Sequence, residues 1–210
     1  HDDWFSQKNS LTIFVDLLEK NPEADFAFSA SSARDQDGKL LFQHTPNAGQ
    51  IKSLRKNKET LFLGNLIGTP STTIYKRSVN LIFDPNLQWF VDVDFYVKIL
   101  TKNSCFIYNP EPLVNITADA AHQVTKLCLN HKRIELFEPI YLYPKINNKM
   151  VRIKEYLNIV HLIKKYHIVS TDDIPRKDKL IISAGIKTAV VLNKICNFLR
   201  DERKYTLENM

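Results

Sequence analysis

Glycine and cysteine are both scarce in this sequence, which holds 5 Gly and 3 Cys among 210 residues. With 44% hydrophobic and 25% charged residues, the chain lacks the bias of collagen-like, low-complexity or disordered proteins. The cysteines are odd in number and too widely spaced for a disulfide framework or a zinc knuckle: Cys105, Cys128 and Cys196. The sequence therefore favours a folded globular protein in a reducing, cytosolic compartment.

Long apolar runs are also missing. The most apolar stretch, Leu180 to Leu199, is interrupted by Lys187 and Lys194. Charged side chains near the middle of a bilayer are costly, so this stretch is not predicted to be a transmembrane helix. No charged segment followed by an apolar one opens the chain, and no signal peptide is predicted.

Positive charge is distributed unevenly along the chain. Residues 1–135 contain 15 Lys and Arg against 15 Asp and Glu, whereas residues 136–210 contain 14 against 8. The second region therefore carries the whole net charge of +6. A turn-forming run from Glu138-Pro139 to Asn147-Asn148 lies close to the same point. Charge and turns together predict two regions, 1–135 and 136–210, of which the second is basic.

Apolar periodicity predicts a layered α/β arrangement in the first region. Helices are predicted from Ser6 to Lys20, from Ile51 to Leu63 and from Val91 to Leu100, and strands over residues 25–31, 40–42, 71–75 and 105–108. The run Asn109-Pro110-Glu111-Pro112 is predicted to end the last strand. In the second region, residues 151–168 and 179–203 show helical spacing, which predicts a helical appendage.

Three groups of residues could do chemistry: Asp2 with Asp3, Asp92 with Asp94, and His122. Paired carboxylates ahead of a helix suit a hard cation that holds substrate phosphates. The same carboxylates would also complement a helix dipole without any ligand, and a single histidine is often only structural. The residue types by themselves leave both interpretations open.

Seven short segments follow one another in a characteristic order. They are His1-Asp2-Asp3-Trp4-Phe5, residues 21–29 (NPEADFAFS), Asp37-Gly38-Lys39, residues 65–71 (NLIGTPS), residues 83–87 (FDPNL), residues 91–96 (VDVDFY) and His122-Gln123-Val124-Thr125. In this order they resemble the second half of family 2 glycosyltransferases. The resemblance implies an α/β fold, the C-terminal half of a Rossmann-like GT-A glycosyltransferase domain, followed by an α-helical appendage.

The resemblance implies roles for the three groups of residues. Asp2 and Asp3 occupy the place of the carboxylates that bind Mg²⁺ or Mn²⁺ bridged to the diphosphate of the donor. Asp92 occupies the place of the catalytic base, and Asp94 would cap the helix or support that base. His122 would contact the diphosphate or the metal.

On the acceptor side, the resemblance points to the loop from Asn65 to Ser71 and to Trp89. Sugars stack on aromatic faces and bond to loop backbone, although Trp89 could equally be a core residue. Two positions depart from the pattern of the family. His1 takes the middle place of the metal motif, which leaves open which of the two following carboxylates binds the metal. Val91 replaces a Glu, which leaves the base itself in place.

The implied function is inverting transfer of a sugar from a nucleotide-diphosphate sugar to a hydroxyl group of a carbohydrate or glycoconjugate acceptor. The base takes the acceptor proton, and the metal neutralises charge on the leaving diphosphate. The family binds its donor nucleotide with a preceding β/α half. This missing N-terminal half is an expected partner, in the same polypeptide or in another, and the chain is expected to be inactive without it.

The basic region supports a different function as an alternative. Residues 136–210 could form a non-catalytic interaction module that docks on the inner face of a membrane through apolar side chains ringed by Lys and Arg. The side chains expected to decide this are Ile181, Val190, Val191 and Ile195, which would instead be buried if the helices pack on the α/β part. Nucleic acid is not an expected partner, because the charge is dispersed through amphipathic helices.

Overall fold

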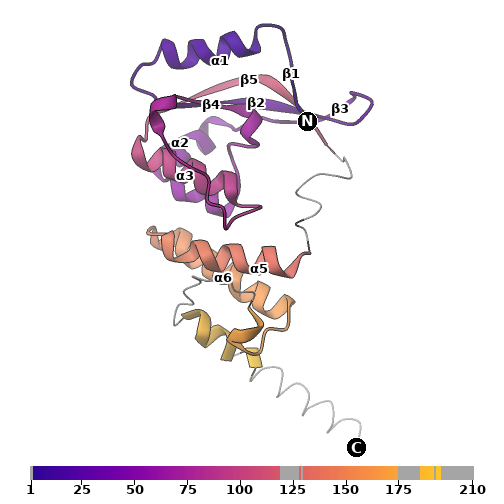
Figure 1. Ribbon diagram of the computed structural model, residues 1–210, viewed down its shortest axis with the longest axis vertical. Helices are drawn as coiled ribbons and strands as arrows, with labels where there is room; N and C mark the ends of the chain where they lie inside the picture. The colour runs from indigo at the N-terminus through magenta and orange to yellow at the C-terminus, as the bar shows by residue number, and fades with distance from the viewer. Residues whose placement is uncertain (1, 119–127, 129, 175–184, 192, 195–210) are drawn as a thin grey trace, which may run out of the picture. The chain divides into compact units, whose positions relative to one another are not determined.

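The computed structural model describes residues 2–118, 128, 130–174, 185–191 and 193–194. The chain divides into two compact units, residues 1–127 and 128–210, of which the first is mixed α/β as predicted (Figure 1). The division precedes the boundary predicted after residue 135, because that position lies inside a helix, α5 (Lys132–Leu142). A charge count shows where basic residues become frequent, but it does not show where one compact unit ends and the next begins.

A mixed sheet of five strands forms the centre of the first unit. β2 (Phe26–Arg34) runs parallel to β5 (Phe106–Thr117), and β1 (Trp4–Phe5) lies antiparallel to β5 on its other side. Two further strands lie antiparallel to β2: β4 (Thr73–Tyr75) along its first half and β3 (Leu40–His44) along its second half.

Helices cover both faces of this sheet (Figure 1). α1 (Ser10–Glu19) lies on one face, and α2 (Ala48–Lys56) and α3 (Val91–Lys102) lie on the other. Three short 3₁₀ segments complete the unit: η1 (Lys58–Leu63), η2 (Pro70–Thr72) and η3 (Arg77–Val79).

β2 is buried on both faces because helices cover both, and its alternating side chains differ in size accordingly. The ring of Phe26 lies 5.7 Å from that of Tyr96 on α3, whereas Ala27 packs with Leu18 of α1. Phe28 adds a second aromatic ring beside Phe26. Large aromatic side chains therefore fill the layer toward α3, and small ones let α1 approach closely.

Three of the differences from the predicted element boundaries have a clear structural cause. Ser6 does not cap the first helix, which begins at Ser10, because its hydroxyl donates to the carbonyl of Pro112 (2.6 Å). The second predicted helix is interrupted at Asn57, whose backbone is extended. β5 continues through Pro110 and Pro112, which have no backbone N–H to donate to a neighbouring strand. The strand tolerates them because its register with β2 shifts at this point, where the regular pairing is already interrupted.

The second unit is helical in its described part. After α5 come η4 (Tyr143–Lys145), α6 (Lys149–Lys165) and η5 (Thr171–Asp173), and residues 185–191 are again helical. Pro139 lies within α5, so the turn predicted at that position does not form. The core of the unit is aliphatic: Leu136, Ile140, Ile159, Leu162, Ile163, Ile168, Ile174, Ile186, Ala189 and Val190.

The side chains expected to decide between packing and membrane contact are only partly described. Val190 is buried in this core, whereas Val191 is 54% exposed. Ile181 and Ile195 lie outside the described residues. In the described part of the chain, no helix is both long enough and apolar enough to cross a membrane.

Candidate functional site

The loop of residues 64–72, here called the Asn65 loop, joins η1 to β4 and closes on itself. The side-chain amide of Asn65 donates to the carbonyl of Gly68 (2.9 Å), and its oxygen accepts from the N–H of the same residue (3.0 Å). Gly68 has φ +99°, a conformation that glycine adopts without steric cost. The side chain of Asn65, predicted to bind an acceptor, is thus engaged in shaping the loop.

Three segments that are distant in sequence hold the Asn65 loop in place. His44, the last residue of β3, has its Nε2 atom 2.8 Å from the carbonyl oxygen of Leu66. Tyr96 on α3 donates its hydroxyl hydrogen to the carbonyl of Gly68 (3.2 Å). Ser71 donates to Oδ2 of Asp3 (2.6 Å), which ties the loop to the segment before β1. The loop is therefore a fixed platform on which separate parts of the first unit meet.

Asp3 and Asp2 lie side by side in sequence where β1 begins, and both are half-buried. Asp3 accepts the hydrogen bond of Ser71, whose hydroxyl also lies 2.7 Å from that of Thr69. The backbone carbonyl of Asp2 accepts a hydrogen bond from Thr117 at the end of β5 (2.6 Å). These contacts fix the backbone of the acidic pair between the sheet and the Asn65 loop.

Asp92 lies in the first turn of α3 and is half-buried. Burial raises the pKa of this carboxyl to about 6, although its own backbone N–H, acting in the opposite direction, stabilises the charged form. Tyr96 lies one turn further along the same helix, and burial followed by the charge of Asp92 raises the pKa of its hydroxyl. The side chain that bonds to Gly68 is therefore within the electrostatic reach of Asp92.

One predicted site residue, Asp3, thus bonds directly to the Asn65 loop, and the helix that carries Asp92 is connected to the same loop through Tyr96. Asp3 bonds to Ser71 at one end of the Asn65 loop, and the helical turn that begins at Asp92 reaches Gly68 through Tyr96. A carboxyl group with a pKa near neutrality can accept a proton at physiological pH, and a carboxylate such as that of Asp3 can hold a cation or orient a polar ligand.

The remaining predicted residues have other surroundings. Asp94 is only 3% exposed and forms an ion pair with Lys98 one turn along α3, which is a structural arrangement. Trp89 is half-buried just before α3, with its ring 6.2 Å from that of Phe90. His122 lies outside the described residues.

Asp2 and Asp3 are the carboxylates that could contact Mg²⁺ or Mn²⁺ at this site. In residues 2–118 and the other described ranges, no group of three or more His, Cys, Asp and Glu side chains could hold a metal by itself. A magnesium ion bound together with phosphates usually needs only one or two protein carboxylates, because phosphate oxygens and waters complete its shell. Asp2 and Asp3 fit that kind of shared site, whereas a site made by protein ligands alone does not fit.

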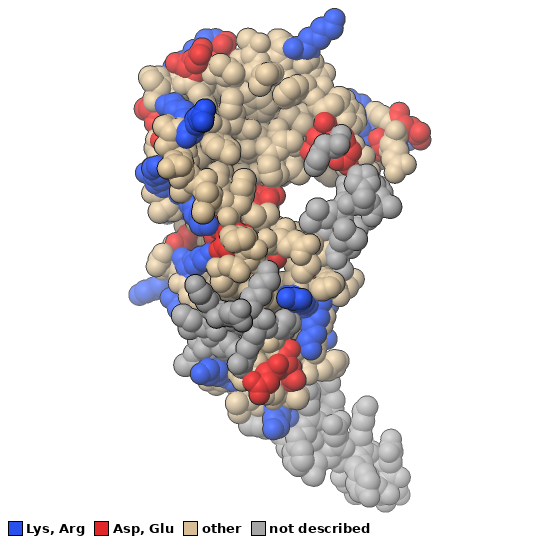
Figure 2. Space-filling model, viewed as in Figure 1, with Lys and Arg blue, Asp and Glu red and all other residues tan. Residues whose placement is uncertain are grey.

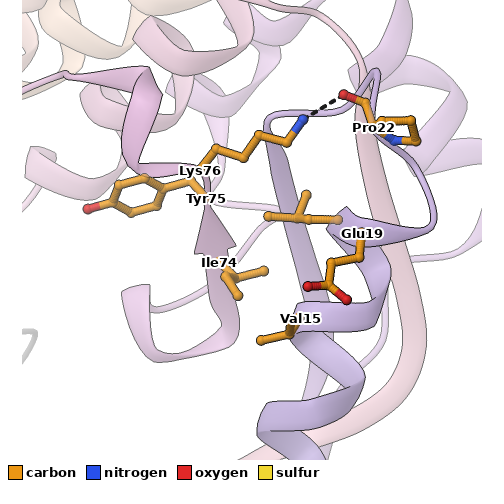
Figure 3. Close-up of a pocket in the computed structure, with 7 residues that line it drawn as sticks. Val15, Glu19, Pro22, Ile74, Tyr75 and Lys76 are labelled. Carbon is orange, nitrogen blue, oxygen red and sulfur yellow. Dashed lines mark hydrogen bonds between the residues drawn. The ribbon is translucent and has the colours of Figure 1, made fainter.

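A separate cavity of about 360 Å³ lies between α1 and β4 (Figure 3). Figure 3 shows Val15 and Glu19 on the helix facing the strand that carries Ile74, with Lys76 donating a hydrogen bond to the carbonyl of Pro22 (2.6 Å). None of the predicted site residues that the structure describes lines it. Glu19 is the only carboxylate among the described residues of its wall, which therefore lack the converging polar groups of a catalytic centre.

Two residues of the site were missed by sequence reasoning. Tyr96 and His44 both hold the Asn65 loop, yet their patterns in sequence are those of a core helix and a strand end. The spacing of Tyr96, four residues after Asp92, was the one available signal, since such residues share a helix face. Comparison with known proteins adds no further residue, because the sequence matches no protein-family model and no curated protein.

Proposed function

We propose that the first unit is the metal and acceptor half of an inverting glycosyltransferase with a GT-A fold. The observation that supports this most directly is the convergence on the Asn65 loop of Asp3 and of the α3 turn that carries Asp92. A sugar transferase needs a diphosphate-holding carboxylate and a base on the two sides of one reacting carbon. The order of the seven sequence segments supports the same function.

Asp92 is the proposed base. An aqueous aspartate, with a pKa of 3.8, is a weak acceptor for the proton of a sugar hydroxyl, whereas a pKa of about 6 makes it a better one that is still ionised at neutral pH. The partly buried position that raises the pKa also keeps water from competing with the acceptor. Asp94, paired with Lys98, supports the N-terminal turn of α3 and takes no proton.

Asp2 and Asp3 are the proposed residues for a divalent cation shared with the donor diphosphate. When bound, Mg²⁺ or Mn²⁺ would neutralise charge on the departing nucleoside diphosphate. Ser71 orients the Asp3 carboxylate by donating to one of its oxygens. The donor nucleotide itself would be held by a preceding β/α half, as the resemblance implies.

The acceptor would approach along the Asn65 loop and Trp89. The loop contributes a rigid backbone, fixed by the amide of Asn65, and Trp89 contributes an aromatic face at the start of α3. In this arrangement Asn65 positions the loop instead of touching the sugar. His122 stays a proposed contact of the diphosphate.

The experiment uses the longest natural polypeptide that contains this chain. Release of nucleoside diphosphate from a panel of nucleotide-diphosphate sugars is measured with Mg²⁺ or Mn²⁺, with and without carbohydrate acceptors. We expect Asp92→Asn to lower kcat by about 10²-fold or more while the donor Kd changes little, because only the base is lost. Asp16→Asn, which removes an exposed ion pair with Lys20 on α1, is the matched control and should leave kcat unchanged.

The outcomes separate the two parts of the proposal. Full activity of Asp92→Asn would show that the base lies elsewhere. Absence of acceptor-dependent release with every donor and both metals would refute the transferase function itself.

A further inference from the structure

The surface of the second unit is more basic than its sequence indicates, because three of its carboxylates are buried. Glu135, Glu138 and Glu155 are 8%, 2% and 4% exposed. In the described part of this unit the only exposed carboxylates are Asp172 and Asp173, against ten exposed basic side chains. Figure 2 shows Lys and Arg over the visible face of this unit. The ten are Lys132, Arg133, Lys145, Lys149, Arg152, Lys154, Lys164, Lys165, Lys187 and Lys194.

The buried carboxylates are taken up by internal contacts. Glu135 accepts hydrogen bonds from the ammonium group of Lys165 and from the hydroxyl of Tyr166, which joins α5 to the end of α6. Glu155 lies on the buried face of α6, where Asn158 donates to it (3.3 Å). Glu135 therefore neutralises only Lys165 among the outer basic side chains, and Glu155 faces the interior of the unit.

The outer face of α6 also exposes large apolar side chains. Met150, Ile153 and Leu157 are 64%, 56% and 60% exposed, and their spacing places them on one stripe of the helix. The stripe lies opposite the buried face, which includes Val151 and Ile159. An ordinary surface helix carries polar residues at such positions. We call these three residues the α6 stripe.

Basic side chains surround the α6 stripe. At 100° per residue, Lys149 and Lys154 lie on its two sides, and Lys164 continues its line toward the end of the helix. The only carboxylate of α6, Glu155, is on the opposite, buried face. The outward face of this helix is therefore apolar along its middle and cationic at its borders.

A cavity of about 420 Å³ adjoins the stripe and shares Ile153 with it. Two tyrosines form its aromatic walls, with the ring of Tyr143 6.4 Å from that of Tyr156. The guanidinium group of Arg152 stacks over Tyr143 at 5.0 Å, and Lys149 completes the cationic side of the cavity. Aromatic and cationic groups thus extend the stripe on one side.

We propose that the outward face of α6 docks the protein on a membrane surface that contains anionic phospholipids. Lipid phosphates would pair with Lys149, Lys154 and Lys164, while the α6 stripe enters the boundary between headgroups and acyl chains. The charge alone would suit nucleic acid or an acidic protein, but neither requires a row of exposed Met, Ile and Leu. The combination of an apolar stripe and a cationic border is typical of helices that lie in the membrane interface.

The proposed membrane contact lies on a different helix from the one expected from the sequence. The predicted contact used the helix that contains Val190 and Val191, yet Val190 belongs to the core of the unit. The exposed stripe lies instead on α6, which carries apolar residues on both its buried and its outward face. The inference is independent of the proposed transferase activity.

The test is sedimentation of the full chain with vesicles of phosphatidylcholine, alone or with about 30% phosphatidylserine, at salt concentrations of about 0.1 M and 0.5 M. We expect binding only to vesicles with phosphatidylserine, and weaker binding at high salt. The triple variant Met150→Ser, Ile153→Ser and Leu157→Ser should bind at least tenfold more weakly at both salt concentrations.

The matched control exchanges an equal number of exposed apolar residues in the first unit, with Leu40→Ser, Leu41→Ser and Phe42→Ser on β3. It should bind as the unchanged chain does, and circular dichroism should show that each variant keeps its helices. No nucleotide sugar is present, so failure here says nothing about transferase activity.

A second variant tests the charge. Lys149→Gln, Lys154→Gln and Lys164→Gln together should weaken binding roughly 100-fold at low salt, about fivefold for each lysine. Three results would overturn the proposal: no binding to either vesicle, equal binding to neutral vesicles, or unchanged binding of the folded stripe variant.

Discussion

Replacing Asp92 by Asn should stabilise the protein at neutral pH even though it removes the proposed base. The folded-state pKa of this carboxyl is about 6, against an ordinary value of 3.8. Because the raised pKa belongs to the folded state, the folded protein binds more protons than the unfolded chain between these two values. Stability contributed by the protonated form is present below pH 3.8 and is lost as the pH rises through 6.

The size of the effect follows from the two pKa values. Their difference corresponds to at most about 3 kcal/mol of unfolding free energy at pH 8, where the wild-type carboxyl is ionised in both states. Asparagine has nearly the same shape and carries no charge, so it avoids this cost. The gain of Asp92→Asn should therefore be close to zero near pH 4 and approach its full value above pH 7.

Urea unfolding of the wild type and of Asp92→Asn at several pH values between 4.5 and 8 measures this difference. The comparison variant is Asp94→Asn on the same helix, which loses the ion pair with Lys98 and should be destabilised by about 1.5–3 kcal/mol at pH 7. An Asp92→Asn protein that is no more stable than wild type at pH 8, or a difference independent of pH, would refute the argument from burial.

Two further predictions concern the loop and the second unit. Gly68→Ala should lower the unfolding free energy by about 1–2 kcal/mol because φ is +99°, whereas the added Cβ would make only an ordinary contact with Oγ1 of Thr72 at 3.5 Å; an unchanged urea midpoint would contradict this. In the second unit, burial alone would raise the pKa of Glu135. Hydrogen bonds from Lys165 and Tyr166 outweigh burial and hold this pKa below its ordinary value of 4.5. This stability is present above pH 4.5 and lost as the pH falls further, so Glu135→Gln should be less stable at pH 7 and lose less on acidification; parallel pH profiles would contradict it.

The helices and strands with strong periodicity could be predicted from sequence, and those that depend on tertiary contacts could not. β2 and α3 lie where alternation and helical spacing placed them. β5 is much longer than predicted, because Pro110 and Pro112 are typical of a strand end, and only the pairing with β2 shows that a shift of register accommodates them. Pro139 likewise predicted a turn, but α5 continues past it.

The acidic residues of the candidate site were proposed from the sequence, whereas the residues that hold its loop are known only from the structure. Asp3 and Asp92 attract attention because paired carboxylates suit a hard cation, although they also complement a helix dipole. The side chains that hold the Asn65 loop, His44 and Tyr96, come from β3 and α3, and no local pattern relates them to that loop. Asn65 itself was expected to bind a ligand, yet both ends of its amide are bonded to Gly68.

The basic surface of the second unit illustrates what a charge count leaves out. A sum over residues gives each carboxylate equal weight, although Glu135, Glu138 and Glu155 are nearly inaccessible to solvent. Interactions between a surface and its surroundings depend on the exposed charges, since those are the ones that counterions and lipid headgroups reach. Burying these carboxylates therefore leaves an outer face whose exposed charges are mostly cationic, and on α6 the buried Glu155 lies opposite the α6 stripe.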